Sequence, residues 1–270
     1  MPAHAQPIKA HHQEAATVWG RGGRHYDDVS FAISDALAHA ALRLDARAGD
    51  LVLDVATGTG WSARNAARSG AEVTAVDISE DLLAAARALS QHIDPAIAFH
   101  CGDAEQLAFA DGAFDGVIST FGVMFATDHA EAAAELARVC RSGGRLVLTT
   151  WAAEGTVAEF FALIGKHSGA PPPPASPLLW GDQAHVEKLL GKAFSLSFEH
   201  GVSHAYHGSV EAIWQWYTRG FGPLRQLAED LAPEALARLK QDIDGYHRHY
   251  AVAAGLTVTR QYLLTLGRRR

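Results

Sequence analysis

The sequence predicts an α/β protein with a mostly parallel sheet that is covered by helices on both faces. Three observations support this: short apolar runs suited to burial on both faces, amphipathic segments between them, and a glycine-rich turn after the first run. With 270 residues, 48% of them hydrophobic, the chain can bury a core of this kind.

Residues 1–44 are predicted to form an N-terminal helical cap. Residues 1 to about 16 are expected to be a mobile start, whereas apolar positions recur at helical spacing from Thr17 to Leu44. The start has no apolar stretch typical of a signal peptide, and no run of 18 apolar residues occurs. We therefore expect a cytoplasmic protein without a membrane span.

Residues 45–151 are predicted to form the ligand-binding core. Apolar runs that end at turn residues predict five strands, at 51–55, 71–77, 96–103, 114–120 and 145–151. Helical segments are expected between them, at 60–69, 80–91 and 129–140. Ser79 is placed to cap the second of these helices.

Residues 152–270 are predicted to complete the sheet, with strands at 194–207 and 256–268 and a helical substrate-lid insert at about 208–252. Pro171–Pro174 should form an extended connector. The insert contains a cluster of aromatic side chains, Trp214, Trp216, Tyr217 and Phe221. These side chains either stack on a substrate or form the core of the lid, and we favour the core slightly.

Composition limits the partners. The formal net charge of −7 argues against a nucleic-acid partner, because binding phosphates needs a basic surface. The two cysteines, Cys101 and Cys140, are too few for a disulfide scaffold or a four-cysteine metal site. A small molecule is the expected partner, bound by a monomer or a homodimer.

The glycine-rich turn indicates a nucleotide site. Gly58-Thr59-Gly60 follows a buried strand and precedes a helix, which is the setting of dinucleotide-binding turns. Asp77 ends the next strand 19 residues after Gly58, where a carboxylate can accept hydrogen bonds from ribose hydroxyls. The ligand is therefore expected to be an adenosine derivative, although Asp77 could also cap the next helix.

Asp54, at the end of the first strand, helps to distinguish a dinucleotide from S-adenosylmethionine as the ligand. A pyrophosphate over the helix N-terminus would be repelled by this acid, which counts against an NAD-dependent oxidoreductase. S-adenosylmethionine has no phosphate and carries an ammonium and a sulfonium group, so an acid near its methionine end is favourable. The alternative is that Asp54 only caps the following turn.

The segment 45–151 resembles the class I S-adenosylmethionine-dependent methyltransferases. "LVLDVATGTG", "AVDIS", "HCGDAEQLAF", "FDGVISTFGVMFATD" and "ELARVCRSGGRLVLTTW" are similar to five of their motifs, in the same order. The chain is most like the small-molecule methyltransferases of ubiquinone and menaquinone biosynthesis (methyltransferase type 11), and "HYDDVS" resembles their Tyr-Asp segment. Ala56 stands where many members have glycine. The resemblance implies a Rossmann-like sheet of seven strands, the last antiparallel, with helical lid elements.

The resemblance also implies which residues bind the cofactor. They are Tyr26, Asp54, Ala56, Thr57, Gly58, Gly60, Asp77, Ile78, Gly102, Asp103, Ala104, Ser119, Thr120 and Phe121. Besides the alternatives given for Asp54 and Asp77, Asp103 could be an ordinary turn acid and Tyr26 a packing residue. Which of Ser119, Thr120 and Phe121 lines the site is also left open. The cofactor implied is S-adenosyl-L-methionine, converted to S-adenosyl-L-homocysteine.

The expected function is transfer of a methyl group to an O, N or C atom of a small-molecule acceptor. The alternative is a protein that binds the cofactor but catalyses a non-methylating rearrangement or cyclisation. His25, His129 and His204 are the candidates for a general base. No metal site is expected, because His11-His12 lacks helical ligand spacing and lies in the predicted mobile start.

Overall fold

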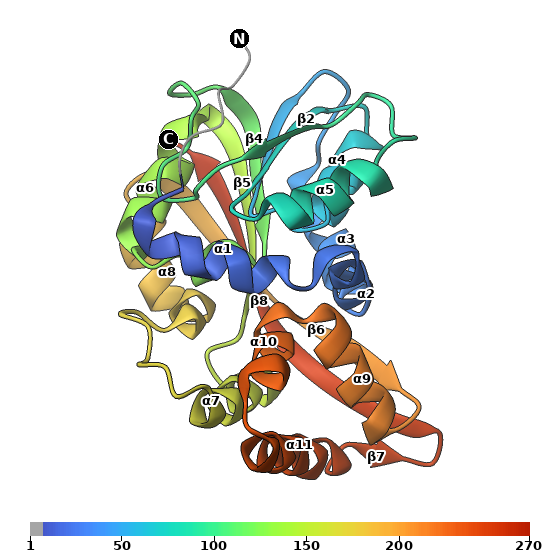
Figure 1. Ribbon diagram of the computed structural model, residues 1–270. Helices are drawn as coiled ribbons and strands as arrows, with labels where there is room; N and C mark the ends of the chain where they lie inside the picture. The colour runs from blue at the N-terminus through green and yellow to red at the C-terminus, as the bar shows by residue number, and fades with distance from the viewer. Residues whose placement is uncertain (1–7) are drawn as a thin grey trace.

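The computed structural model describes residues 8–270 and has a twisted sheet at its centre (Figure 1). The strand order is β3-β2-β1-β4-β5-β8-β6, and β7 pairs with β8. In chain order the strands are β1 (Leu51–Val55), β2 (Glu72–Asp77), β3 (Ala98–Cys101), β4 (Phe114–Thr120), β5 (Cys140–Trp151), β6 (Phe194–His207), β7 (Ala251–Val252) and β8 (Gly255–Arg269). The first five strands pair in parallel, whereas β8 is antiparallel to both β5 and β6. The predicted mostly parallel sheet with an antiparallel last strand is therefore confirmed.

The predicted number of strands, seven, is wrong by one. The eighth is β7, which has two residues and forms a hairpin with the start of β8 through the pairs Ala251↔Leu256 and Val252↔Gly255. A two-residue strand is too short to show the alternation by which strands are recognised in a sequence. Gly255 has a φ of +131°, a conformation that favours glycine and turns the chain into β8.

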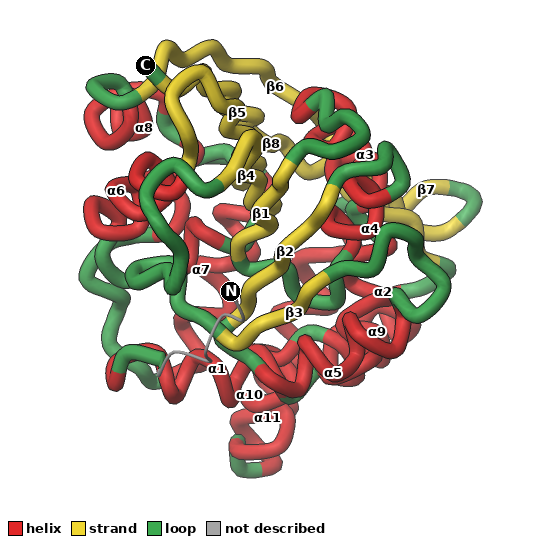
Figure 2. The backbone as a smooth tube through the Cα atoms, turned by 90° about the horizontal axis from the view of Figure 1, so that it is seen from above, coloured by secondary structure: helices red, strands yellow, loops and turns green. Residues whose placement is uncertain are grey.

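Helices cover both faces of the sheet (Figure 2). One face carries α3 (Ser34–Leu44), α4 (Trp61–Ala67) and α5 (Glu80–Leu89), and the other carries α6 (His129–Val139) and α8 (Gln183–Leu190). Side chains cap three of them: Ser79 accepts a hydrogen bond from Leu82 N–H at 3.4 Å, and Asp128 and Asp182 cap α6 and α8. These caps satisfy backbone donors that the first turn of a helix leaves unpaired.

A second layer of helices lies beyond the carboxyl ends of the parallel strands (Figure 1). It contains α7 (Thr156–Ser168), α9 (Val210–Gly220), α10 (Gly222–Asp230) and α11 (Pro233–Arg248), and it packs on the extended ends of β6 and β8. The short helix η4 (Pro177–Gly181) follows the proline run. This layer has its own small core of Phe160, Trp214, Leu224, Leu239 and Ile243. Trp214 is only 8% exposed, which confirms the core interpretation for this residue.

The N-terminal segment crosses the molecule between the sheet and this second layer (Figure 1). It contains η1 (Ala10–His12), α1 (Gln13–Gly20), η2 (Gly23–His25) and α2 (Tyr26–Phe31). The expectation of a mobile start up to residue 16 is wrong from residue 8 onward, because polar contacts of Lys9, His11 and His12 to the loop after β3 hold this part in place. Residues 1–7 lie outside the described part of the chain. No helix within 8–270 is long and apolar enough to cross a membrane.

Candidate cofactor site and active site

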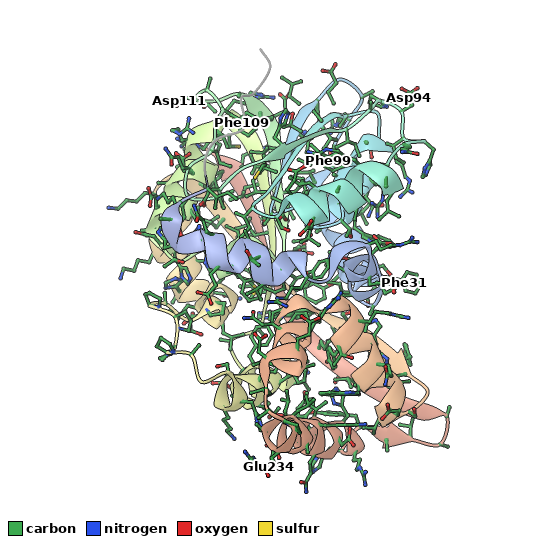
Figure 3. The ribbon with its side chains drawn as sticks, in the orientation of Figure 1. Phe31, Asp94, Phe99, Phe109, Asp111 and Glu234 are labelled. Atoms are coloured by element: carbon green, nitrogen blue, oxygen red, sulfur yellow. The ribbon has the colours of Figure 1, made fainter. Side chains whose placement is uncertain are left out.

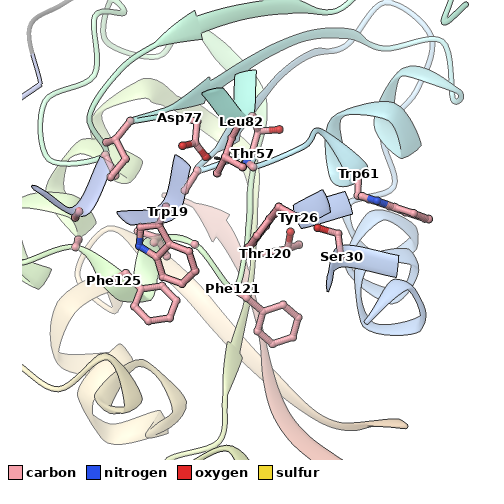
Figure 4. Close-up of a pocket in the computed structure, with 18 of the residues that line it drawn as sticks. Trp19, Tyr26, Ser30, Thr57, Trp61, Asp77, Leu82, Thr120, Phe121 and Phe125 are labelled. Atoms are coloured by element: carbon pink, nitrogen blue, oxygen red, sulfur yellow. Dashed lines mark hydrogen bonds between the residues drawn. The ribbon is translucent and has the colours of Figure 1, made fainter. Parts of the chain in front are cut away.

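A cavity opens where the strands β1, β2 and β4 end, beneath the N-terminal segment (Figure 4). Ligands of open α/β sheets bind at this edge, where strand order reverses. Eleven of the predicted cofactor-binding residues line it: Tyr26, Ala56, Thr57, Gly58, Asp77, Ile78, Gly102, Asp103, Ala104, Thr120 and Phe121. The other three, Asp54, Gly60 and Ser119, are buried behind these lining residues.

The glycine turn leads from β1 into α4 and is hydrogen-bonded to the end of β2, where Val76 O accepts from Thr57 N–H at 2.9 Å. Gly58 has a φ of +56° and Gly60 a φ of +86°, so both need the left-handed conformation that glycine adopts without strain. Asp77 accepts hydrogen bonds from Gly58 N–H at 2.8 Å and from Ser79 N–H at 2.9 Å. Burial raises the pKa of Asp77 to about 6, although these two N–H groups act in the opposite direction. The acid thus supports the turn while it faces the cavity.

Asp54 is completely buried. Its Oδ2 accepts a hydrogen bond from the Thr57 hydroxyl at 2.6 Å, while Oδ1 has no hydrogen-bond partner among the described residues. Burial raises the pKa of Asp54 to about 7. The backbone N–H of Ala63, in the first turn of α4, lies close enough to lower this pKa, although it makes no hydrogen bond to Oδ1 within 3.5 Å. A buried acceptor without such a bond is rare in folded proteins, so a further donor at Oδ1 would be favourable. The ammonium group of a methionine moiety is a donor of the required charge, so the residues of this site fit S-adenosylmethionine.

Asp103 lines the cavity and also organises its own loop. Its Oδ1 accepts a hydrogen bond from Glu105 N–H at 3.0 Å, as a turn acid would. Its Oδ2 accepts one from Lys9 N–H at 3.1 Å and lies 2.8 Å from His12 Nδ1. The turn interpretation is therefore confirmed, and the contact with adenine stays a prediction.

Asp27 connects the N-terminal segment to the glycine turn. Its Oδ1 accepts hydrogen bonds from the Thr59 hydroxyl at 2.9 Å, from Trp61 Nε1 at 2.7 Å and from the Arg64 guanidinium at 3.2 Å. The neighbouring Tyr26 lies over Gly58, where an added Cβ would be 3.2 Å from the Tyr26 ring. Asp27 thereby holds Tyr26 against the turn, and sequence reasoning missed this role.

The end of β4 contributes residues with different roles. Ser119 is buried and donates a hydrogen bond to Val55 O at 2.7 Å, which ties β4 to β1. Thr120 lines the cavity with its hydroxyl 2.8 Å from that of Ser62. Phe121 also lines the cavity, with a φ of +57°, and its ring stacks on Trp151 at a centroid distance of 4.0 Å.

Aromatic and apolar side chains form the rest of the cavity wall. The ring centroids of Trp19 and Phe125 lie 4.8 Å apart. Ile33 is the residue before α3, and Leu37 belongs to the first turn of that helix. Ser30 adds a hydroxyl group. Sequence reasoning did not single these residues out, because in the N-terminal segment they carry only an ordinary helical pattern. Of these residues, Ser30 and Phe125 lie within quoted motifs, "HYDDVS" and "FDGVISTFGVMFATD".

None of the three candidate general bases lines the cavity. The His25 ring is nearly half exposed, and its Nδ1 lies 3.9 Å from Asp28. His129 is buried, with its Nδ1 3.1 Å from Nε2 of His185, and His204 is exposed on β6. The histidine that does line the cavity is His12, which the sequence placed in a mobile start.

Comparisons with known proteins identify the family of this chain. A family described as "Methyltransferase domain" matches residues 53–148. An uncharacterized protein of Mycobacterium tuberculosis (strain ATCC 25618 / H37Rv) is 34% identical over 199 residues, which are 72% of either chain. A demethylmenaquinone methyltransferase of Mycolicibacterium vanbaalenii is 40% identical over 140 residues, which are 50% of this chain and 59% of that protein.

A solved structure shows the same fold. The crystal structure of a putative methyltransferase from Bacillus halodurans superimposes with a TM-score of 0.62 at 22% identity, covering 87% of this chain and 98% of the other. The fold, the motifs and the acids at the ends of β1 and β2 are those expected for binding S-adenosylmethionine. The chain belongs to the class I S-adenosylmethionine-dependent methyltransferases, of the menaquinone and ubiquinone type.

Proposed function

We propose that this methyltransferase methylates an O, N or C atom of a small, uncharged aromatic acceptor, such as a phenol or a quinol. The observation that carries the proposal is the distribution of charge around the cavity. The charged or titratable side chains Asp77, Asp103 and His12 lie with Ile78 and Ala104 around the predicted adenosine end. Toward Phe121 the wall has aromatic and apolar side chains together with the hydroxyl groups of Thr120 and Ser30 and, within residues 8–270, no carboxylate (Figure 4).

The acceptor part of this cavity would be formed by Trp19, Ile33, Leu37, Phe121 and Phe125. Such a wall favours a planar apolar molecule, because aromatic rings stack on one another and a buried charge without a partner is costly. The demethylmenaquinone methyltransferases among the relatives act on an acceptor of the kind that their name states, which supports a quinol-like ring here.

Catalysis would then depend mainly on positioning. When bound, S-adenosylmethionine supplies a methyl group already activated by a sulfonium. The chain's own task is to hold the acceptor in line and to exclude water, and alignment of this kind can contribute roughly 7–11 kcal/mol. The hydroxyl groups of Tyr26, Ser30 and Thr120 are the polar groups available to orient an acceptor oxygen.

Label transfer from S-adenosylmethionine tests the proposal. The protein is incubated with a methyl-labelled donor and a panel of neutral phenols and quinols, matched with amines and carboxylates of similar size. Label in the neutral aromatic compounds supports the proposal, whereas label only in charged acceptors overturns it. A changed acceptor that carries no label would favour the alternative, a rearrangement or cyclisation.

A pair of variants separates the acceptor site from the cofactor site. Phe125→Ala should raise KM for the acceptor while the Kd for S-adenosylhomocysteine changes little. Phe31→Ala is the matched control, because Phe31 is 66% exposed on the outer side of α2 and does not line the cavity (Figure 3). Equal effects of the two substitutions would contradict the assignment of the acceptor wall.

A cytoplasmic location, a monomeric or homodimeric state and the lack of a nucleic-acid partner remain part of this proposal.

A further inference from the structure

We propose that His11, His12 and Glu105 form a binding site for one divalent transition-metal ion of the Zn²⁺ class, which fastens the N-terminal segment over the cofactor site. Two imidazoles and one carboxylate are a ligand set that Zn²⁺ uses when a water molecule completes its coordination. Within residues 8–270 this is the group of histidine, cysteine and acidic side chains whose ligand atoms all lie within 4.8 Å of one another.

The distances suit such an ion. His11 Nε2 lies 2.9 Å from Glu105 Oε2, and His12 Nε2 lies 3.2 Å from Glu105 Oε1. Bonds of about 2.0–2.1 Å in a tetrahedral arrangement separate neighbouring ligand atoms by roughly 3.3 Å. The three groups can therefore bind one ion after small shifts of the side chains.

The surroundings orient two of these ligands. Asp103 Oδ2 lies 2.8 Å from His12 Nδ1, so the ring donates from Nδ1 and Nε2 is an acceptor, which receives a hydrogen bond from Thr127 N–H at 3.3 Å. Metal-binding histidines have this arrangement, in which a carboxylate fixes the tautomer. Glu105 is buried, and its Oε1 accepts a hydrogen bond from Asp128 N–H at 2.7 Å. His12 Nε2 also lies 3.0 Å from the Thr127 hydroxyl, and the ion would replace both contacts of Nε2 with Thr127.

A cation already lies next to this carboxylate. Lys9 Nζ is 3.4 Å from Glu105 Oε2 and also contacts Glu131. The ion would replace the ammonium group at Glu105 and leave Lys9 paired with Glu131. Because the His11 side chain is 47% exposed, the ion can enter from solvent.

The position of the site gives the ion a role. His11 and His12 belong to η1, whereas Glu105 belongs to the loop after β3, next to Asp103. His12 and Asp103 both line the cofactor cavity. Metal binding would therefore join the N-terminal segment to the sheet beside the predicted adenosine end, and by linkage it would strengthen S-adenosylhomocysteine binding.

Titration of the metal-free, tag-free, full-length protein with Co²⁺ and Zn²⁺ tests the site. We expect one Co²⁺ per chain with the visible absorption of tetrahedral Co²⁺, and its displacement by Zn²⁺. His11→Ala and Glu105→Gln should each raise the Kd at least about tenfold, since each removes a ligand. Lys9→Gln should lower it, because a competing cation is removed.

His25→Ala is the matched control, since His25 is a histidine of the same segment outside the cluster, and it should leave the Kd unchanged. Hydrogen exchange of residues 8–20 should slow when Zn²⁺ is added to the wild-type protein but not to His11→Ala, a substitution at an exposed residue that leaves the fold intact. The proposal is overturned if Glu105→Gln and His11→Ala bind Co²⁺ as the wild type does, or if bound Co²⁺ shows only an octahedral spectrum.

Discussion

Asp77, at the end of β2, accepts a hydrogen bond from the backbone N–H of Gly58 at 2.8 Å, so one carboxylate joins the second strand to the glycine turn. Asp77→Asn keeps the size of the side chain but removes its charge and half of its acceptors. We expect the Kd for S-adenosylhomocysteine to rise about 10- to 100-fold, because hydrogen bonds to charged groups contribute about 1.5–3 kcal/mol. Isothermal titration calorimetry measures this change.

Asp115→Asn is the control for this prediction. Asp115 is also an acid of a sheet strand, but it pairs with Arg141 and with Leu51 N–H at the opposite end of β1 and β4. Its substitution should lower stability slightly and leave ligand affinity unchanged. An Asp77→Asn protein that is folded and binds like the wild type would rule out the ribose role.

The two glycines Gly60 and Gly49 allow strain to be separated from function. They have φ values of +86° and +84°, so alanine at either position should destabilise the protein by about 1–2 kcal/mol. A Cβ at Gly60 would lie 3.3 Å from the Phe99 ring and 3.4 Å from Ala86, whereas one at Gly49 meets nothing within 4 Å. Only Gly60→Ala should also weaken S-adenosylhomocysteine binding, which thermal unfolding and calorimetry together would show.

Asp27 and Asp28 are adjacent acids on α2 with different surroundings. Asp27 receives three donors, among them the Arg64 guanidinium, whose side chain is 8% exposed; the Asp28 side chain is 53% exposed. Asp27→Asn should lower the free energy of unfolding by about 1–3 kcal/mol, since it leaves a buried cation without its charged partner. Asp28→Asn should change it by less than about 0.5 kcal/mol. Urea unfolding of both variants checks this, and equal effects would contradict the role of Asp27.

Local patterns made much of the fold, and many residues of the cavity, predictable. The ends of β1 and β2 follow from apolar runs that stop at Asp54 and Asp77, and in a parallel sheet such ends meet at one edge. Residues in sequence motifs, such as Gly58, Asp103 and Phe121, therefore fell into the cavity as expected.

The contributions of the N-terminal segment could not be predicted in the same way. His12, Trp19 and Asp27 reach the site only because α1 and α2 fold back over the strand ends. His12 contacts Asp103, Trp19 contacts Phe125 and Asp27 contacts Trp61, and no local periodicity encodes contacts over such distances along the chain. The histidines proposed as bases were chosen by residue type alone, and their positions outside the cavity wall show how little that criterion constrains location.

We expect Asp54 to make both stability and ligand binding depend on pH. Its native pKa of about 7 lies above the ordinary value of 3.8, so between these pH values the native state binds more protons than the unfolded state. The free energy of unfolding should therefore fall as the pH rises from about 4 to about 7, and Asp54→Asn should reduce this slope. Asp77, with a pKa of about 6, adds a slope of the same sign that ends at a lower pH.

Binding should show the opposite dependence on pH. The ammonium end of S-adenosylhomocysteine is attracted by the ionised form of Asp54, so affinity should rise with pH until about pH 7 and then level off. Below about pH 7, each decrease of one pH unit should raise the Kd up to about tenfold, because the carboxylate must lose its proton before it binds the ammonium group. Calorimetry in buffers of different ionisation enthalpy would detect the released proton. A Kd that is constant over this range, or an Asp54→Asn variant with the same pH profile as the wild type, would show that Asp54 does not meet the ligand's cationic end.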